Sequence, residues 1–124
     1  MREVFMLIGR RGALLWSDAS SDPTKLEDSQ ARWQAIWQHR EELEELSHSH
    51  PMGPLAFSEE DRTTMAALEA ALGKTLKFSI VAPGGMLMKR GDEQALVADE
   101  PWWAALLRLA SGMPAAAART HKEE

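Results

Sequence analysis

The apolar residues of this chain repeat with two different periods, and segments of the two kinds alternate along the sequence. Short apolar runs bounded by turn residues are typical of strands, and they cover residues 4–8, 13–16, 76–82, 86–89 and 95–97. Apolar residues spaced three and four apart are typical of helices, and they cover residues 26–43, 58–72 and 101–110. This interleaving predicts an α/β (α+β) fold, with one central mixed sheet flanked by helices.

The length of the chain fits a single domain. Its 124 residues lie within the range of roughly 100 to 200 residues that one domain usually takes. With 44% hydrophobic residues, the chain has enough apolar side chains to bury a core. We expect residues 1–113 to form that domain. Residues 114–124 carry an alanine run and mixed charges without a core pattern, so we expect them to form a mobile tail.

The composition excludes several kinds of site and partner. The chain has no cysteine, which excludes disulfides, thiolate zinc sites, iron–sulfur clusters and a cysteine nucleophile. Its formal charge of -5 argues against nucleic acid or an anionic membrane as the main partner. The longest apolar runs are far shorter than the roughly 20 residues that span a bilayer, and no signal-peptide pattern opens the chain. We therefore expect a cytoplasmic protein whose partner is a protein or a peptide.

Two histidines and an aspartate have the spacing of a metal site. His48 and His50 are two residues apart, so on an extended backbone their imidazoles lie on the same face. Asp61 lies in the first turn of the helix predicted after Ser58, and the connecting loop is long enough to bring that turn over the histidines. Two imidazoles and a carboxylate are ligands that Zn²⁺ accepts, and they leave a fourth tetrahedral position for water. The sequence therefore predicts one catalytic zinc ion bound by His48, His50 and Asp61.

Hydrolysis at such an ion needs further groups. Zinc lowers the pKa of a bound water to about 7, but a nearby carboxylate must take up the proton and return it to a leaving amine. Ser58 could donate a hydrogen bond to the oxyanion of the tetrahedral intermediate. Ser58 and Asp61 also have the spacing of a helix cap, in which the serine accepts an amide hydrogen bond. The two roles are compatible, because a cap also orients the helix that carries the ligand.

The pattern His48-Ser-His50-Pro51, six residues and Ser58-x-x-Asp61 resembles the signature of the JAMM metalloproteases, also called MPN or JAB domains. The resemblance is to the compact prokaryotic type, covers about residues 3–110, and includes the segment Glu3-Val-Phe-Met-Leu-Ile-Gly9. It implies a fold with the layering of cytidine deaminases. It also implies that Glu3 is the general acid/base, that His48, His50 and Asp61 bind the metal, and that Ser58 assists the oxyanion.

The activity implied by this resemblance is that of a zinc-dependent metallopeptidase or isopeptidase. Bacterial members of the compact type are associated with the C-terminal tails of ubiquitin-like or sulfur-carrier proteins, or with other tail-like peptides. We expect a substrate of this kind. Two alternatives stay open: a non-catalytic MPN scaffold that binds partners, and a zinc hydrolase of another class. A nucleobase deaminase is set aside, because its usual ligand set requires cysteines.

Several residues outside the motif also carry expectations. Trp33, Ile36 and Trp37 are expected to lie in the core or at an interface rather than to form a substrate platform. Trp102 and Trp103 are adjacent, so on a helix at least one of them should be partly exposed, where it could belong to a homodimer interface. The glutamate-rich segment 41–47 before His48 favours only a short strand.

Overall fold

The computed structural model describes residues 1–20 and 29–114. Six strands occur in these ranges: β1 (Val4–Ile8), β2 (Leu14–Ala19), β3 (Glu45–Ser49), β4 (Lys77–Ala82), β5 (Gly85–Arg90) and β6 (Glu93–Leu96). They are accompanied by three α-helices: α1 (Gln30–Gln38), α2 (Glu59–Leu72) and α3 (Trp102–Ser111). None of these helices has the length and apolar character needed to cross a bilayer. Except for Pro114, the predicted tail 114–124 lies outside the described residues.

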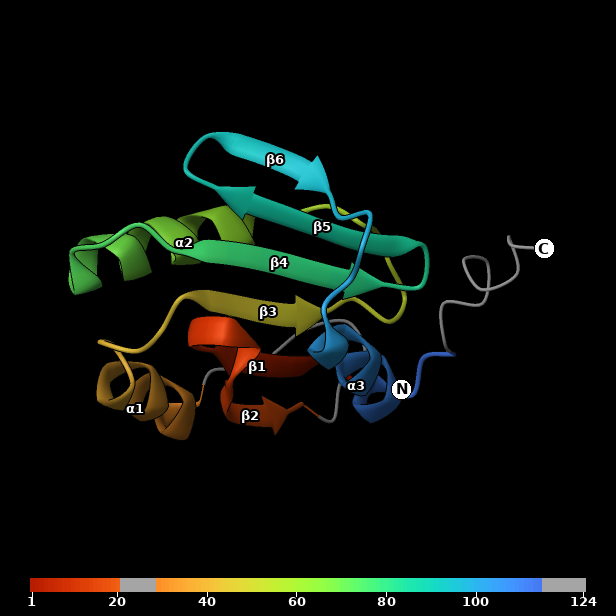
Figure 1. Cartoon of the computed structure of the whole chain (residues 1–124), viewed down its shortest axis with the longest axis horizontal. Helices are drawn as coiled ribbons and strands as arrows, with labels where there is room; N and C mark the ends of the chain where they lie inside the picture. Colours follow the sequence, from red (N-terminus) through yellow and green to blue (C-terminus); the bar gives the residue numbers. More distant parts are fainter. Residues whose placement is uncertain (21–28, 115–124) are drawn as a thin grey trace.

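The strands form one sheet in the order β2-β1-β3-β4-β5-β6 (Figure 1). β3 and β4 are parallel and are connected through α2, whereas the other neighbouring pairs are antiparallel. Phe5 of β1 lies opposite His48 of β3, and His48 lies opposite Ile80 of β4. The predicted central mixed sheet is therefore confirmed, and the short strand β3 lies in its interior.

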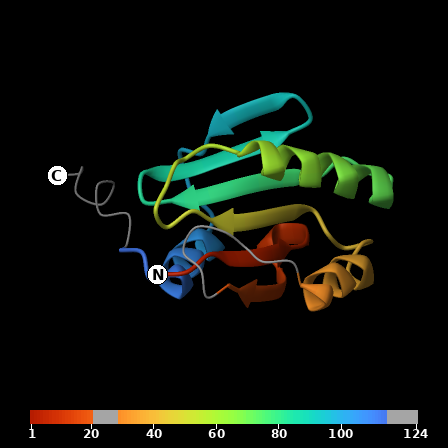
Figure 2. The ribbon, with the colours of Figure 1, turned by 180° about the vertical axis from the view of Figure 1, so that it is seen from behind.

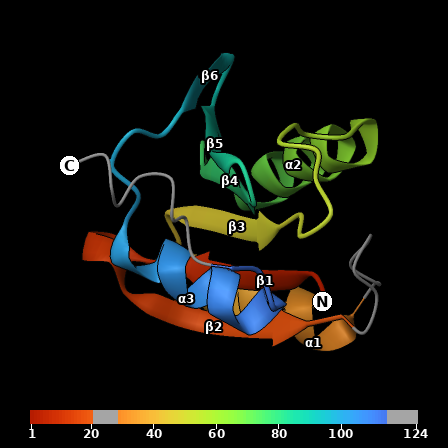
Figure 3. The ribbon, with the colours of Figure 1, turned by 90° about the vertical axis from the view of Figure 1, so that its right-hand side faces the viewer.

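Helices cover both faces of this sheet. α1 and α2 pack on one face, and in Figure 2 α2 lies in front of β4 and β5. α3 packs on the opposite face, against β1, β3 and β4 (Figure 3). Ile36, Leu46 and Met65 belong to the core beneath α1 and α2, while Trp103 and Leu107 belong to the core beneath α3. The alternation of side chains along each strand therefore decides which of the two cores a residue enters.

The first helix is shorter than its apolar spacing predicted. The pattern over residues 26–43 predicted one helix, but α1 ends at Gln38 and the chain then turns. Leu43 follows the turn and is fully buried beneath α1 and α2. Lys74 donates hydrogen bonds from Nζ to the carbonyls of Arg40 (3.0 Å) and Leu43 (2.9 Å). These tertiary contacts stabilise the turn, so Leu43 enters the core from a loop and not from a helix face.

The tryptophans divide between core and surface. Trp103 is 1% exposed and Trp102 is 59% exposed, which confirms that one of the adjacent pair points outward. A role for Trp102 in a homodimer stays a prediction. Ile36 is buried as expected, but Trp33 is 40% exposed and Trp37 is 56% exposed. These two tryptophans therefore do not lie in the core, and an interface at this position stays a prediction.

Glu45, at the start of β3, places a carboxyl group inside the fold. It is 8% exposed, and this burial raises its pKa, although Ser79 and Lys77 act in the opposite direction. The folded state therefore binds the proton more tightly than the unfolded state does. As a result, the free energy of unfolding falls as the pH rises above 4.5, the ordinary pKa of the group.

Replacing Glu45 by glutamine, which keeps the shape without the charge, should raise the melting temperature at neutral pH. We expect a gain of roughly 2–5 °C, or about 1 kcal/mol in a domain of this size. Near pH 4 the gain should largely disappear, because the carboxyl is then mostly protonated in the folded state. Thermal unfolding of the exposed control Glu41→Gln should show no such pH-dependent gain. Equal or lower stability of the Glu45 variant at pH 7 would mean that the contacts with Ser79 and Lys77 fully compensate the burial of the charge.

Candidate metal centre

β3 brings the two histidines of the motif to one face of the sheet. His48 is in β3, and His50 follows its end, where the backbone N–H of His50 donates to the carbonyl of Val81 (2.9 Å). This bond continues the pairing with β4, so the chain stays extended and both imidazoles lie on the side of α1 and α2, as does Leu46. The two Nε2 atoms are 3.0 Å apart. The predicted convergence of the two imidazoles is therefore present.

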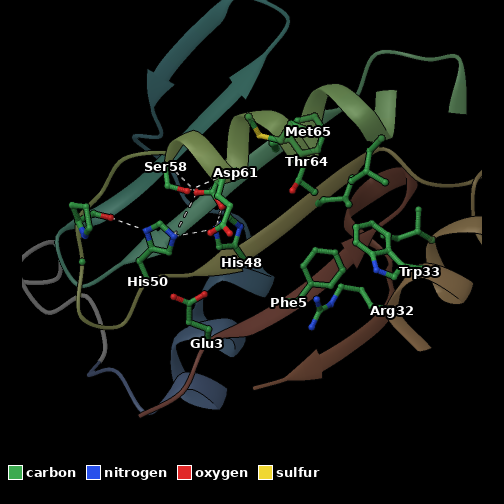
Figure 4. A pocket seen from close by; sticks show the side chains of 17 residues that line it. Glu3, Phe5, Arg32, Trp33, His48, His50, Ser58, Asp61, Thr64 and Met65 are labelled. Atoms are coloured by element: carbon green, nitrogen blue, oxygen red, sulfur yellow. Dashed lines mark hydrogen bonds and ion pairs between the residues drawn. The ribbon is translucent and has the colours of Figure 1, made fainter. Parts of the chain in front are cut away.

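Asp61 reaches these histidines from the first turn of α2. Its Oδ1 lies 3.5 Å from Nε2 of His48, and its Oδ2 lies 3.8 Å from Nε2 of His50. One ligand atom from each of the three residues lies within 4.8 Å of the others, a separation that allows all three to contact one ion. Figure 4 shows the three side chains pointing toward one another. The structure thus joins two segments separated by a loop, as the motif predicted.

A helix cap fixes the position of Asp61. Ser58 Oγ accepts a hydrogen bond from the backbone N–H of Asp61 (3.0 Å), and Asp61 Oδ2 accepts one from the backbone N–H of Ser58 (2.8 Å). This reciprocal capping box confirms the predicted cap at the start of α2. Because Ser58 accepts in this contact, its hydroxyl proton can still be donated elsewhere. The cap and the predicted oxyanion role therefore do not compete for the same atom.

The protonation states of His50 and Asp61 suit a divalent cation. Burial and the neighbouring His48 lower the pKa of His50. His50 Nδ1 lies 2.8 Å from the carbonyl oxygen of Pro54, which can only accept, so Nδ1 carries the proton and Nε2 is directed at the site. Burial would raise the pKa of Asp61, but hydrogen bonds from His48 and Ser58 lower it to about 2. Unprotonated imidazole nitrogen and ionised carboxylate are the forms that bind zinc.

Glu3 lies beside these ligands. It precedes β1, is 5% exposed, and lines the same cavity as His48 and His50. In Figure 4 its carboxylate is directed toward the two imidazoles. The structure therefore brings all five residues of the motif to one place. It assigns no catalytic role to Glu3 or Ser58, and those roles stay predictions.

The cavity that contains the centre has a volume of about 580 Å³ and extends beyond the motif. Away from His48 and Asp61 it runs between α1 and α2 over an apolar floor. This floor and its walls include Phe5, Trp33, Ile36, Leu46, Met65, Leu68 and Phe78. Arg32 supports the floor, because its guanidinium stacks on Phe5 (5.2 Å) and pairs with Asp18 (3.3 Å). We name this region the apolar groove.

Sequence reasoning missed the apolar groove, although part of it was accessible to the same rules. Phe5 is two residues after Glu3, so the two share one face of an extended segment. Met65 is four residues after Asp61, so the two share one face of α2. Trp33 was expected in the core or at an interface, and it lines this cavity. No local pattern places α1 opposite α2, since that depends on the sheet between them.

Fold and site together define the class of the protein: a small α/β domain with two histidines from a central strand and one aspartate from a helix start. The chain matches the family described as prokaryotic homologs of the JAB domain over residues 6–102, and it belongs to that family. The matched range contains His48, His50, Ser58 and Asp61, whereas Glu3 precedes it. No curated protein matches the chain.

Proposed function

We propose that the protein is a zinc-dependent hydrolase that cleaves a peptide or isopeptide bond. The observation that carries the proposal is the convergence of His48, His50 and Asp61 beside the buried carboxylate of Glu3. A metal site together with an adjacent carboxylate is the minimal set for metal-assisted hydrolysis. Membership of the JAB family supports the same conclusion.

The roles proposed for the protein side chains follow from their positions. When bound by His48, His50 and Asp61, zinc supplies Lewis-acid polarisation and makes a water molecule more acidic. Glu3 takes one proton from the attacking water and delivers it to the nitrogen of the leaving amine when the carbon–nitrogen bond breaks. Ser58 donates its hydroxyl proton as a hydrogen bond to the oxyanion that forms on the carbonyl oxygen.

The proposed substrate is the C-terminal tail of a ubiquitin-like or sulfur-carrier protein. The apolar groove supports a polypeptide substrate, because it extends from the metal centre between α1 and α2 with apolar side chains beneath it. An extended tail could place its scissile amide at the metal centre and apolar side chains in the groove. The choice of carrier proteins among possible polypeptides rests on the family resemblance.

A fusion protein tests this proposal. A sulfur-carrier protein joined through its C-terminal tail to a second protein should be cut at the tail by the zinc-loaded enzyme. Cleavage should stop when a chelator removes the metal, and it should return when Zn²⁺ is added back. A protein that binds one zinc ion per chain but cuts neither this fusion nor a panel of tail peptides would instead support the scaffold alternative.

Ser58 allows the oxyanion role to be separated from the cap. Ser58→Ala should lower the turnover rate by about 10²- to 10³-fold, as is typical when one oxyanion donor is lost. It should also lower the free energy of unfolding by about 1 kcal/mol, because the cap is lost. Ser58→Gly should cost only a few tenths of a kcal/mol, since glycine is tolerated at this position. Equal rate losses in both variants would support the donor role, and a rate restored in the glycine variant would contradict it.

A further inference from the structure

The backbone pairing of β1 with β3 does not extend to Glu3, although on the β2 side the carbonyl of Glu3 accepts a hydrogen bond from the backbone N–H of Ser20 (2.9 Å). β1 begins at Val4, and the pairs between β1 and β3 run from Phe5 opposite His48 to Ile8 opposite Glu45. Glu3 therefore lies just beyond this ladder, although the protonation of a leaving amine demands a close fit between Glu3 and the ligands. At this end of the sheet, the segment that contains Glu3 is connected to β3 by a side-chain contact and not by backbone pairing.

Ser49 provides the connection between the two segments. It lies between His48 and His50, and the alternation of side chains along the strand directs it to the opposite face of the sheet, where it is fully buried. Its Oγ accepts a hydrogen bond from the backbone N–H of Val4 (2.8 Å). The residue after Glu3 is thus bound to the residue between the two histidine ligands.

Ser111, at the end of α3, completes the connection. Its hydroxyl donates to Ser49 Oγ at 2.6 Å, although the two residues are 62 positions apart in the sequence. The backbone N–H of Arg2 donates to the carbonyl of Ser111 (3.1 Å), and Arg2 Nε donates to the carbonyl of Ala110 (3.0 Å). The residues on both sides of Glu3 are therefore held by the same pair of serines or by the helix end beside them.

α3 can serve as a fixed support because it is itself tied to the sheet. Arg108, one turn before Ser111, forms an ion pair with Glu100 and donates to the carbonyls of Ala82 (3.0 Å) and Gly85 (3.2 Å). These contacts connect α3 to the end of β4 and the start of β5. A shift of the end of α3 would therefore be opposed by the centre of the sheet.

We propose that the buried hydroxyl pair of Ser49 and Ser111 is a positioning device that sets Glu3 against the metal ligands. This inference rests on the proposed function, because it concerns the geometry of the proton transfer. Ser49 and Ser111 lie on the far face of the sheet. Their hydroxyls act through the backbone N–H of Val4, and the carbonyl of Ser111 holds the backbone N–H of Arg2. α3, which contributes no side chain to the cavity described above, thereby becomes part of the catalytic apparatus.

The matched control for this device is Ser47. It is also a fully buried serine of β3 on the same face, but its Oγ donates to the carbonyl of Ser79 (3.4 Å) and not to the segment that carries Glu3. Ser49→Ala and Ser111→Ala should lower kcat on the carrier-protein fusion by about 10- to 100-fold, as expected for a small misplacement of a reacting group. KM and the zinc content per chain should not change. Ser47→Ala should leave kcat within about twofold of the parent.

A double-mutant cycle distinguishes positioning from a general structural effect. In a Glu3→Gln background, Ser49→Ala and Ser111→Ala should change the residual rate by less than about twofold, because the group they position is already gone. The same loss in both backgrounds, or a Ser47→Ala variant as slow as Ser49→Ala, would overturn the inference. If Ser49→Ala does not fold, Ser111→Ala still tests the device, because it removes the hydroxyl that donates to Ser49 Oγ and leaves Ser49 itself in place.

Hydrogen exchange gives a readout that needs no substrate. Amides of residues 2–5 should exchange faster in Ser49→Ala and Ser111→Ala than in the parent, with and without Zn²⁺, whereas Ser47→Ala should match the parent. Unchanged exchange in both variants would overturn the device. If the parent cuts neither the fusion nor any peptide, the proposed function fails. Faster exchange in the two serine variants would in that case show that the Ser49–Ser111 contact holds residues 2–5 in place but has no catalytic purpose.

Discussion

Replacing Glu3 by glutamine should lower the rate of amide hydrolysis by about 10²- to 10⁴-fold, the usual contribution of a general acid/base. The amide keeps the shape and the hydrogen-bonding atoms of the side chain but cannot carry the proton from water to the leaving amine. The metal ligands are untouched by this change, so the zinc content should stay at about one ion per chain. In this variant the rate of hydrolysis should therefore fall while the zinc content stays unchanged.

The control for this variant is Glu59→Gln, which removes the same charge from an exposed position in the first turn of α2. It should retain the parent rate on the carrier-protein fusion. The measurement pairs turnover with metal analysis of the same preparations. A Glu3→Gln protein that is zinc-loaded and as fast as the parent would remove Glu3 from the mechanism, and another carboxylate would have to be sought in the cavity.

The second large effect is expected for His50→Ala. Loss of a residue that merely hydrogen-bonds a zinc ligand typically costs 10- to 100-fold in affinity, so loss of the ligand itself should cost more than about 100-fold. The variant should be purified with little zinc and should show no activity above background. His39→Ala is the matched control. His39 lies outside the metal centre, and its Nδ1 is 3.3 Å from Glu42 Oε1.

Thermal unfolding checks the same prediction without a substrate. A ligand present at a hundred times its dissociation constant stabilises the folded state by about 2.7 kcal/mol, so Zn²⁺ should raise the melting temperature of the parent and of His39→Ala. It should leave His50→Ala unchanged. An equal shift in His50→Ala would place the bound zinc elsewhere on the protein and would contradict the ligand assignment.

The parts of the site that the sequence made predictable are those set by local rules. The two histidines share a face because side chains alternate along an extended strand. Asp61 is oriented by a helix cap that is formed within four consecutive residues. Gly73 ends α2 with a φ of 67°, a left-handed conformation that glycine adopts without steric cost. The family resemblance then supplied Glu3, which no periodic pattern would have singled out.

The parts that could not be predicted depend on contacts between distant segments. The end of α1 at Gln38 is followed by a turn that Lys74 holds from beyond α2. The contact of Ser111 with Ser49 joins the end of α3 to the middle of the sheet. The sequence position of a serine does not predict which distant hydroxyl it will contact, because that contact depends on how the helices pack on the sheet. The apolar groove between α1 and α2 has the same origin.

The two carboxylate oxygens of Asp61 make different contacts, and this difference affects how the protein binds and releases a metal ion. Oδ2 is engaged by the amide that begins α2, while Oδ1 is the oxygen closer to His48. An incoming cation can therefore take one oxygen without breaking the hydrogen bond made by the other. The ion should then bind and dissociate without a change in the backbone conformation. The domain should therefore stay folded when the ion is lost and bind a new ion without refolding.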